Sequence, residues 1–395
     1  MVAHKGGGAR ASPSSQNNEI AIPIQWPEAA EAISRAAASR PGLVVAICGP
    51  KNSGKSTFSR FLLNTLLQRY RRVAYLDTDV GQPEFSPPGS MSLHIVDEVI
   101  EDLSNSSVRA PERSFFFGDI SSKRDPEAYL NCVYNLYDHF VTHFRKNGSE
   151  DNCGSVLPLI INTPGWVKGT GFDILVEIMR YVSPSVVVQL RISLQRKNLP
   201  TGAFWLEGEE PTCLLDLIDI ESAQQDLLHR SVLVKKDARF FRGSLISEYF
   251  RQCFTSDISI STNKELAFAL ASIPPYQVPF SRVTVKHLHH QVPADEILHS
   301  LNATIVGLAV SSDRPTRANS YPWCIGLGII RGIDVSRGLL YVITPVPIQS
   351  LQKVDILLQG LIEIPTRLLQ VHGCVSPYMC TNVVHTISHK DLLES

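Results

Sequence analysis

The sequence predicts an α/β protein: a mostly parallel, doubly wound sheet followed by a smaller β-rich C-terminal domain. Over roughly the first half of the chain, short apolar β-type runs alternate with amphipathic helical segments. Such alternation requires crossover connections and favours a parallel sheet that is covered on both faces. Beyond the Pro274–Pro275 pair the character changes, and β-like runs follow one another.

The composition supports a folded, intracellular protein of two or three domains. The chain has 395 residues, of which 44% are hydrophobic and 19% charged, as in globular proteins. Lys and Arg number 37 against 38 Asp and Glu, which excludes a uniformly basic nucleic-acid binder. No apolar stretch is long enough for a membrane span, so we expect no membrane association. The cysteines form no C-x-x-C pair, which favours a reducing compartment.

The elements of the first domain follow from local patterns. Residues 1–21 are rich in Gly, Ser, Ala and Asn and predict a disordered tail. A Pro-led helix is expected from Pro27 to Ala38, and apolar residues at helical spacing predict a second helix over 58–70. Buried strands are expected at 43–48, 73–76, 114–117, 156–161 and 185–190, and a further helix over 129–144.

The last third of the chain predicts a different architecture. Residues 201–228 are acidic without Lys or Arg, and residues 229–242 are basic, which is typical of oppositely charged solvated helix faces. Strands are expected at 304–310, 325–330 and 339–344, the last two joined by a hairpin connection over 334–338.

One glycine loop carries the clearest chemical signal. Gly49-Pro-Lys-Asn-Ser-Gly-Lys-Ser56 matches G-x-x-x-x-G-K-[ST] and stands between a β-type run and an amphipathic helix. Glycines allow backbone N–H groups to surround phosphate oxygens at a helix start. The motif predicts a P-loop NTPase domain with a nucleoside triphosphate site formed by Gly49, Pro50, Lys51, Asn52, Ser53, Gly54, Lys55 and Ser56. Lys55 would contact the β- and γ-phosphates, and the Ser56 hydroxyl would hold Mg²⁺.

Two carboxylates end the next strand, in Asp77-Thr-Asp79-Val-Gly-Gln82. Carboxylates at strand ends face the ligand crevice of doubly wound sheets. One of them can hold Mg²⁺, partly through water, and the other can accept a proton from an attacking hydroxyl group. The alternative is a loop whose aspartates cap a helix.

A third segment, Asn162-Thr-Pro-Gly-Trp166, follows the strand at 156–161. Many ATPases and GTPases have a magnesium-binding aspartate where this chain has Asn162, and Asn263-Lys-Glu-Leu266 lacks the aspartate that reads guanine. Both features argue against a simple switch GTPase. Trp166 can stack on a nucleobase, although a tryptophan that packs in the fold is the ordinary alternative.

The sequence allows two interpretations of several basic residues. Arg239 and Arg242 are spaced to share a helix face and could reach a γ-phosphate from a mobile lid at about 205–250, or be solvated. Arg60, Arg69, Arg71 and Arg72 either widen the phosphate-binding surface or are solvated helix charges. His287, His289 and His290 have no suitably spaced ligand partner, so we expect no metal site there.

Together these motifs resemble the polynucleotide 5′-hydroxyl-kinase family, and more specifically its nucleolar branch, which works in pre-ribosomal-RNA processing. The resemblance covers about residues 22–375 and rests on residues 48–57, 76–89 and 118–121, with Gly332–Asp334 and Thr344–Pro347 in the last third. It implies a P-loop polynucleotide kinase domain over 22–273 and a C-terminal domain over 274–395.

The resemblance also implies residue roles. The loop from Gly49 to Thr57 would bind the phosphates of ATP together with Mg²⁺. The chain would transfer the γ-phosphate of ATP to the 5′-OH end of RNA, with Asp79 as general base and Asp77 as the acid on the magnesium side. The sequence leaves open which aspartate takes which role. Arg239 and Arg242 would be lid arginines, and the terminal nucleotides would be held by Gln82, Thr163, Pro164, Gly165 and Trp166.

In the nucleolar branch the kinase works with a HEPN-type endonuclease. That partner cuts an internal transcribed spacer and leaves a 5′-OH end, so the resemblance implies this partner and a location in the nucleus and nucleolus. Three alternatives stay open: a relative acting in mRNA 3′-end or tRNA processing, an ATP-binding scaffold without transfer activity, and a nucleotide-switch NTPase.

Overall fold

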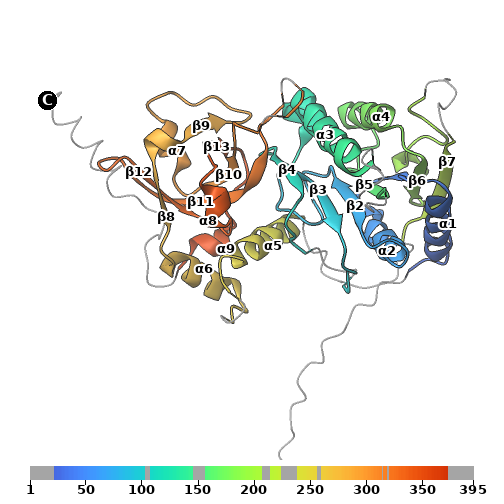
Figure 1. Cartoon of the computed structure of the whole chain (residues 1–395), viewed down its shortest axis with the longest axis horizontal. Coiled ribbons are helices and arrows are strands. Elements are labelled where there is room, and N and C mark those ends of the chain that lie inside the picture. The colour runs from blue at the N-terminus through green and yellow to red at the C-terminus, as the bar shows by residue number, and fades with distance from the viewer. Residues whose placement is uncertain are drawn as a thin grey trace, which may run out of the picture.

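The computed structural model describes residues 22–102, 107–145, 156–206, 214–223, 238–255, 259–313, 315–317 and 320–371. These residues form two sheets that lie side by side, each with its own helices (Figure 1). The tail expected over residues 1–21 lies outside the described residues. None of the helices described is both long and apolar enough to cross a membrane.

The first sheet has seven strands in the order β4-β3-β2-β5-β1-β6-β7. The five strands from β2 to β7 in this order are parallel, and β3 and β4 add to one side as antiparallel strands. This confirms the mostly parallel sheet. The strands are β1 (Val44–Cys48), β2 (Val73–Asp77), β3 (Ser90–Val96), β4 (Arg113–Phe116), β5 (Leu159–Asn162), β6 (Val186–Arg191) and β7 (Asp216–Glu221).

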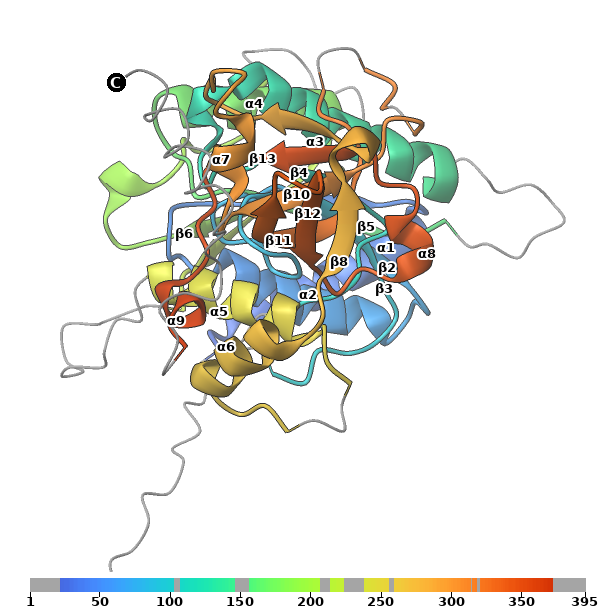
Figure 2. The same cartoon turned by 90° about the vertical axis from the view of Figure 1, so that its left-hand side faces the viewer.

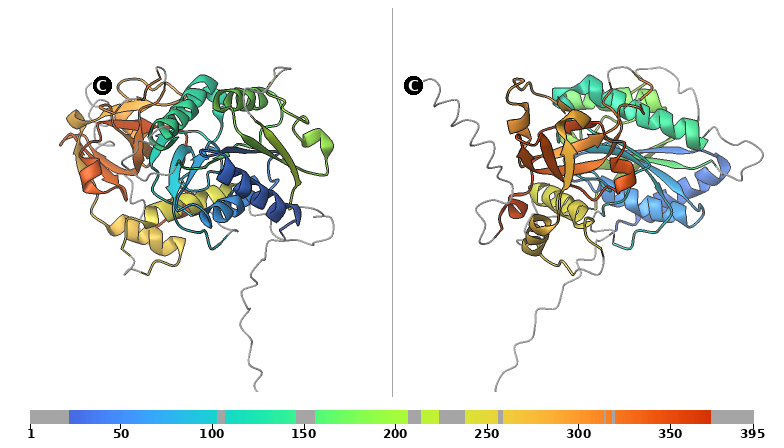
Figure 3. Two further views of the ribbon diagram at one scale, coloured as in Figure 1. Left: turned by 45° about the vertical axis from the view of Figure 1, so that its right-hand side comes forward. Right: turned by 60° about the vertical axis from the view of Figure 1, so that its left-hand side comes forward.

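Helices cover both faces of this sheet, as the buried apolar strands require. Trp26 and Ile33 of one helix and Phe58 and Leu62 of the next pack on one face, whereas Tyr129 belongs to the cluster on the other face. The left view of Figure 3 shows the sheet between these two layers. The first face carries α1 (Gln25–Ser39) and α2 (Lys55–Leu67), and the second carries α3 (Pro126–Phe140) and α4 (Thr170–Val182).

The acidic stretch differs from its prediction. Residues 216–221 form strand β7 at the edge of the sheet and not a helix face. Acidic and apolar residues alternate there, and among the described strands β7 pairs with β6 alone, so β7 is buried less than β6. Most of the basic stretch 229–242 lies outside the described residues.

The second sheet has six strands in the order β8-β12-β11-β10-β13-β9 and is antiparallel except between β13 and β9. The three predicted strands and the hairpin are confirmed in β10 (Ile305–Ala309), β11 (Cys324–Asp334) and β12 (Leu339–Ile343). In the hairpin turn, Asp334 Oδ1 accepts a hydrogen bond of 3.0 Å from the Arg337 N–H. The remaining strands are β8 (Tyr276–Pro279), β9 (Thr284–His287) and β13 (Ile356–Gln359), and Figure 2 faces this sheet.

Two helices that precede the second sheet in the chain pack against it. Phe250 of α5 (Ala238–Arg251) and Leu266 of α6 (Asn263–Ser272) share a buried cluster with Ile329 and Leu358. The shorter helices are α7 (Ile297–Leu301), α8 (Ile348–Leu351) and α9 (Thr366–Leu369). The proposed domain boundary near residue 274 and the lid at about 205–250 stay predictions.

The two sheets meet along β4. The Ser114 hydroxyl donates a hydrogen bond of 2.7 Å to the Cys324 carbonyl, and the rings of Phe115 and Trp323 stack 4.2 Å apart. Gly307 lies so close to Phe116 that a Cβ atom on it would be 2.7 Å from the Phe116 side chain. The second sheet therefore packs directly on the edge of the first.

Candidate active site

The register of three parallel strands brings the sequence motifs to one edge of the sheet. Ile47 of β1 pairs with Asn162 of β5, and Asn162 also pairs with Asp77 of β2. Because parallel strands end at the same edge, the glycine loop after β1, the aspartates after β2 and the segment after β5 lie next to one another.

The glycine loop takes its shape from backbone angles that favour glycine. Gly49 has φ 144° and Gly54 has φ 92°, and a Cβ atom on Gly49 would lie 2.5 Å from the Leu190 carbonyl oxygen. Helix α2 begins directly after Gly54, which has no side chain to cap it. The start of α2 is therefore open to an anion.

Lys55 is held inside this loop. Its side chain is 7% exposed, and its Nζ donates a hydrogen bond of 2.8 Å to the Pro50 carbonyl. Burial lowers the pKa of Lys55 to about 8, and the nearby Asp79 carboxylate partly opposes that shift. A phosphate bound in the loop would offset the cost of burying this charge.

Asp77 is fully buried at the end of β2 and accepts three hydrogen bonds. The donors are the N–H of Asp79 at 3.1 Å, the N–H of Glu84 at 2.5 Å and the side-chain amide of Asn162 at 3.2 Å. Burial raises the pKa of Asp77 to about 8, although the backbone N–H groups of Glu84 and Asp79 act in the opposite direction. A cation beside Asp77 would favour its ionised form.

Asp79 faces the same edge but is only half-buried. Its Oδ1 accepts hydrogen bonds from the N–H groups of Gly81 (3.0 Å) and Gln82 (3.1 Å), and its Oδ2 accepts none from the described residues. Gly81 in turn lies against residues 118–121, because a Cβ atom on it would be 3.0 Å from the Ile120 carbonyl oxygen. One oxygen of Asp79 thus fixes the loop and the other is available to a hydroxyl group.

Residues 163–166 cover the glycine loop. A Cβ atom on Gly165 would lie 2.6 Å from the Lys51 backbone nitrogen, so the two segments touch backbone to backbone. Trp166 is half-buried, with its ring centre 5.5 Å from that of Tyr129, whose hydroxyl donates to the Thr78 carbonyl at 2.5 Å. Trp166 packs in the fold and still exposes part of its surface, so both interpretations of this residue remain compatible with its position.

The oxygen atoms at this edge fit a hard cation such as Mg²⁺. Ser56 in the first turn of α2 and the Asp77 carboxylate are two oxygen donors, and Mg²⁺ prefers oxygen. Asn162 Oδ1 is buried and accepts no hydrogen bond from the described residues, so this oxygen can still accept a bond from a ligand. Among those residues no group of three or more His, Cys, Asp or Glu side chains is arranged to hold a metal ion.

The structure does not bring every candidate to this edge. Arg239 and Arg242 lie near the start of α5, where Gly243 approaches Pro365, and the same helix packs against the second sheet through Ile246 and Phe250. Their role as lid arginines stays a prediction.

Arg60 neither widens an exposed phosphate-binding surface nor is a solvated helix charge, so both interpretations of this residue are wrong. Arg60 is 5% exposed and forms an ion pair of 3.3 Å with Glu84, which is 2% exposed. The reason is its position on the buried face of α2. Arg69, one of the same group, pairs at the surface with Glu31 at 2.6 Å.

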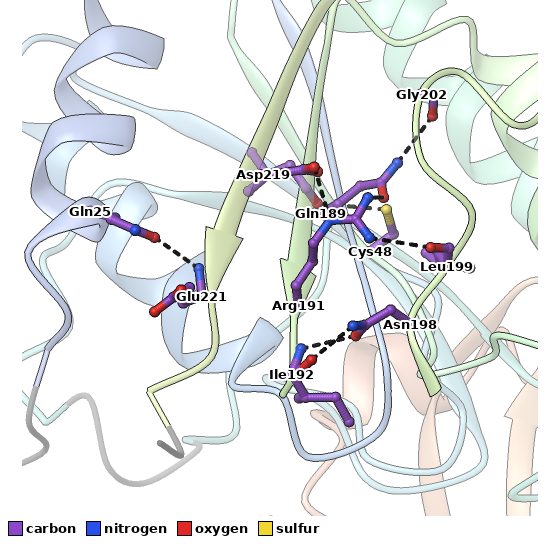
Figure 4. A network of polar contacts seen from close by, with 11 residues as sticks. Gln25, Cys48, Gln189, Arg191, Ile192, Asn198, Leu199, Gly202, Asp219 and Glu221 are labelled. Atoms are coloured by element: carbon purple, nitrogen blue, oxygen red, sulfur yellow. Dashed lines mark hydrogen bonds and ion pairs between the residues drawn. The ribbon is translucent and has the colours of Figure 1, made fainter. Parts of the chain in front are cut away.

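The three histidines at and after β9 take part in contacts within the fold. His289 lies 2.6 Å from the Phe117 carbonyl oxygen, and His287 lies 2.9 Å from the Ser300 hydroxyl. Local sequence patterns do not indicate a role for Glu84, nor the polar network in which Arg191 pairs with Asp219 at 2.9 Å beside Cys48 (Figure 4). Glu84 lies in the motif after Gln82, but nothing local to it indicates its partner on α2.

Comparison with known proteins agrees with both halves of this architecture. Residues 49–204 match the family model of the P-loop of the mRNA cleavage and polyadenylation factor CLP1, and residues 271–365 match the NOL9-like C-terminal domain. A solved Clp1p structure, described with its Pcf11p interface, has a TM-score of 0.60 at 15% identity and covers 86% of this chain and 79% of its own. That likeness shows the shared fold.

Curated relatives cover most of the chain. It is 53% identical to polynucleotide 5′-hydroxyl-kinase NOL9 of Arabidopsis thaliana over 94% of this chain and 98% of that protein. It is 33% identical to the Danio rerio protein and 30% identical to the Homo sapiens protein of the same name, each over 86% of this chain. The chain spans about half the length of these two, 49% and 52%. From this identity and coverage, the chain belongs to the polynucleotide 5′-hydroxyl-kinase NOL9 family, a family of transferases.

Proposed function

We propose that this chain is an ATP- and Mg²⁺-dependent RNA 5′-hydroxyl kinase that acts in pre-ribosomal-RNA processing. The observation that carries the proposal is the strand register that joins Ile47, Asn162 and Asp77. That register unites a phosphate-binding loop, two carboxylates and a tryptophan-containing segment at one edge. These are the parts that phosphoryl transfer to a hydroxyl group requires.

The reaction is an in-line displacement at the γ-phosphorus. The 5′-oxygen of the RNA forms the new P–O bond, Asp79 Oδ2 accepts the proton of that hydroxyl, and the bond to the β-phosphate oxygen breaks to release ADP. Lys55 and the start of α2 stabilise the charge on the phosphates. Mg²⁺, held through Ser56 and on the Asp77 side, would add charge neutralisation.

Recognition of the RNA end falls to the segment that covers the loop. Trp166 would stack on a terminal base, with Gln82, Thr163, Pro164 and Gly165 as neighbours. The exposure of Gln82 and the contact between Gly165 and Lys51 support this, because a 5′ end bound there would lie directly beside the glycine loop. Proximity and orientation then supply most of the rate.

A direct assay tests the activity. Purified protein is incubated with γ-labelled ATP, Mg²⁺ and a short RNA that carries either a 5′-OH or a 5′-phosphate, beside a 5′-OH DNA of the same sequence. We expect label on the 5′-OH RNA and none on the phosphorylated RNA. Protein that binds ATP and labels neither RNA would be the scaffold, and ATP hydrolysis without any acceptor would indicate a switch NTPase.

The processing role and the partner rest on the family resemblance of residues 332–334 and 344–347. We propose a nucleolar location and a HEPN-type endonuclease as partner. Affinity purification of tagged protein from its own cells is expected to recover such a nuclease, and depletion is expected to leave spacer fragments with 5′-OH ends. Recovery of mRNA cleavage factors in its place would favour the mRNA 3′-end or tRNA branch.

A further inference from the structure

A buried ion pair connects the two motifs of the candidate site. Arg60 on α2 and Glu84 after β2 are 5% and 2% exposed, and Arg60 Nε lies 3.3 Å from Glu84 Oε1. Both charges are out of water, where each compensates the other. Neither residue has a role in the proposed transfer.

Each partner of the pair also contacts one side of the site. Arg60 Nε lies 3.4 Å from the backbone carbonyl of Ser56, the residue next to Lys55. The backbone N–H of Glu84 donates a hydrogen bond of 2.5 Å to Asp77 Oδ2. Ser56 and Asp77 are the two residues proposed to hold Mg²⁺. A continuous series of contacts therefore connects Ser56 to Asp77 through Arg60 and Glu84.

A gain in stability does not explain why a buried ion pair is present at this position. Buried ion pairs are often no more stabilising than well-packed apolar side chains of similar volume. A guanidinium group differs from an apolar side chain in its fixed, directional donors. Here the Arg60 Nε–H donates to the Ser56 carbonyl at 3.4 Å, and the same nitrogen lies 3.3 Å from the Glu84 carboxylate as an ion pair. This one nitrogen therefore lies between the two motifs and holds them at a fixed spacing.

We propose that Arg60 and Glu84 are positioning residues that hold Ser56 and Asp77 at the spacing needed to bind Mg²⁺ together with ATP. The inference rests on the proposed function, since it concerns the same site. It predicts that loss of the pair weakens the Mg²⁺-dependent part of ATP binding. The loop from Gly49 to Lys55 would still bind the phosphates without Mg²⁺.

Nucleotide binding tests the proposal without any transfer step. The affinity for a fluorescent ATP analogue is measured at a series of Mg²⁺ concentrations. The proteins compared are wild type, Arg60→Met, Glu84→Gln and the double variant Arg60→Met/Glu84→Leu. Mg²⁺ is expected to increase the affinity for the ATP analogue. We expect each single variant to need about tenfold more Mg²⁺ than wild type to reach half of that increase. The affinity measured without Mg²⁺ should stay within about threefold of wild type. Arg317→Met, which breaks the ion pair with Asp138 away from the site, is the matched control and should leave the titration unchanged.

Thermal unfolding separates positioning from packing. We expect the double variant to recover the melting temperature lost in Arg60→Met, because no unpaired charge remains buried, but not the Mg²⁺ dependence. Glu84→Gln nearly preserves size and keeps the measurement open if Arg60→Met does not fold. A normal Mg²⁺ titration in Glu84→Gln or in the double variant would overturn the proposal, as would Mg²⁺-independent binding by wild type. Wild type that binds MgATP normally but phosphorylates no RNA would contradict only the proposed function.

Discussion

The side-chain amide of Asn162 donates a hydrogen bond of 3.2 Å to Asp77 Oδ1, across the neighbouring ends of β5 and β2. Many related NTPases carry a second carboxylate where this chain has Asn162. A carboxylate there would face the buried Asp77 carboxylate. The Asn162 amide instead donates to one oxygen of Asp77, and its own Oδ1 can still bind a ligand. Of these two strand ends, only the end of β2 carries a buried carboxylate.

Asn162→Asp is expected to destabilise the protein in a pH-dependent way. Two carboxylates in contact cannot both ionise easily, and the pKa of Asp77 is already raised to about 8 by burial. We expect a loss of about 1–3 kcal/mol in the free energy of unfolding at pH 8, and a smaller loss at pH 5, where both groups can be protonated. Chemical denaturation at both values measures this.

Asn162→Ala is the control, since it removes the amide donor without adding a charge. Its loss of stability is expected to change less between pH 5 and pH 8. Equal losses at both pH values in the Asp variant would refute like-charge repulsion as the cause.

Gly165→Ala is expected to weaken ATP binding about tenfold or more. The new Cβ atom would lie 2.6 Å from the Lys51 backbone nitrogen and 2.7 Å from its Cα, so a movement of the Lys51 side chain alone cannot relieve the clash. The glycine loop must therefore shift. Isothermal titration with ATP measures the effect, with Gly243→Ala as control because its Cβ atom would meet nothing closer than 3.8 Å. Unchanged ATP affinity in Gly165→Ala would show that the contact is not needed.

Trp166→Ala is expected to raise the KM for RNA by about 5- to 150-fold, which corresponds to one base-stacking contact of about 1–3 kcal/mol. The KM for ATP should stay within about twofold of wild type. Trp166→Phe keeps an aromatic face against Tyr129 and should retain most of the RNA affinity. If Trp166→Ala only lowers the melting temperature and leaves both KM values unchanged, the residue is a packing tryptophan.

His94 predicts a specific acid sensitivity of the fold. It is buried beside Ser92 (2.9 Å) and Ser86 (3.2 Å), and burial lowers its pKa to about 3, from about 6.5 in an exposed histidine. Between pH 6.5 and 3 the unfolded chain binds a proton at His94 that the folded chain does not, so stability falls as the pH falls through this range. One such proton corresponds to about 1.4 kcal/mol per pH unit.

His94→Gln is expected to remove up to that slope from the free energy of unfolding between pH 6 and pH 4.5. Urea denaturation at a series of pH values measures it, and stability above pH 7 serves as the reference for the substitution itself. Parallel curves for wild type and variant would mean that His94 already takes up its proton in the folded state.

Local patterns predicted much of the fold and the core of the site. The Gly49–Ser56 motif connects a strand to a helix, as expected. Asp77 and Asn162 lie side by side because each is the last residue of one of two paired parallel strands. Periodicity sufficed for these features because it reports which face of an element is buried. It did not find β7, since acidic residues there occupy a strand that pairs along one edge only.

The long-range polar contacts were not predictable in the same way. Arg60 reads as one more helix charge, and its burial follows only when Glu84, after another strand, is packed against α2. The short edge strands β8 and β9 carry little apolar pattern, and β8 ends in Pro279. Contacts of this kind depend on tertiary packing, which no local window contains.

The most direct test of the account is single-turnover transfer from γ-labelled ATP to 5′-OH RNA by wild type and Asp79→Asn. The asparagine keeps an oxygen that can accept the Gly81 and Gln82 N–H bonds but cannot accept the proton of the RNA hydroxyl. We predict transfer at least about 100-fold slower in the variant, with ATP affinity within about threefold of wild type. Wild type that transfers no label, or a variant as fast as wild type, would contradict the account.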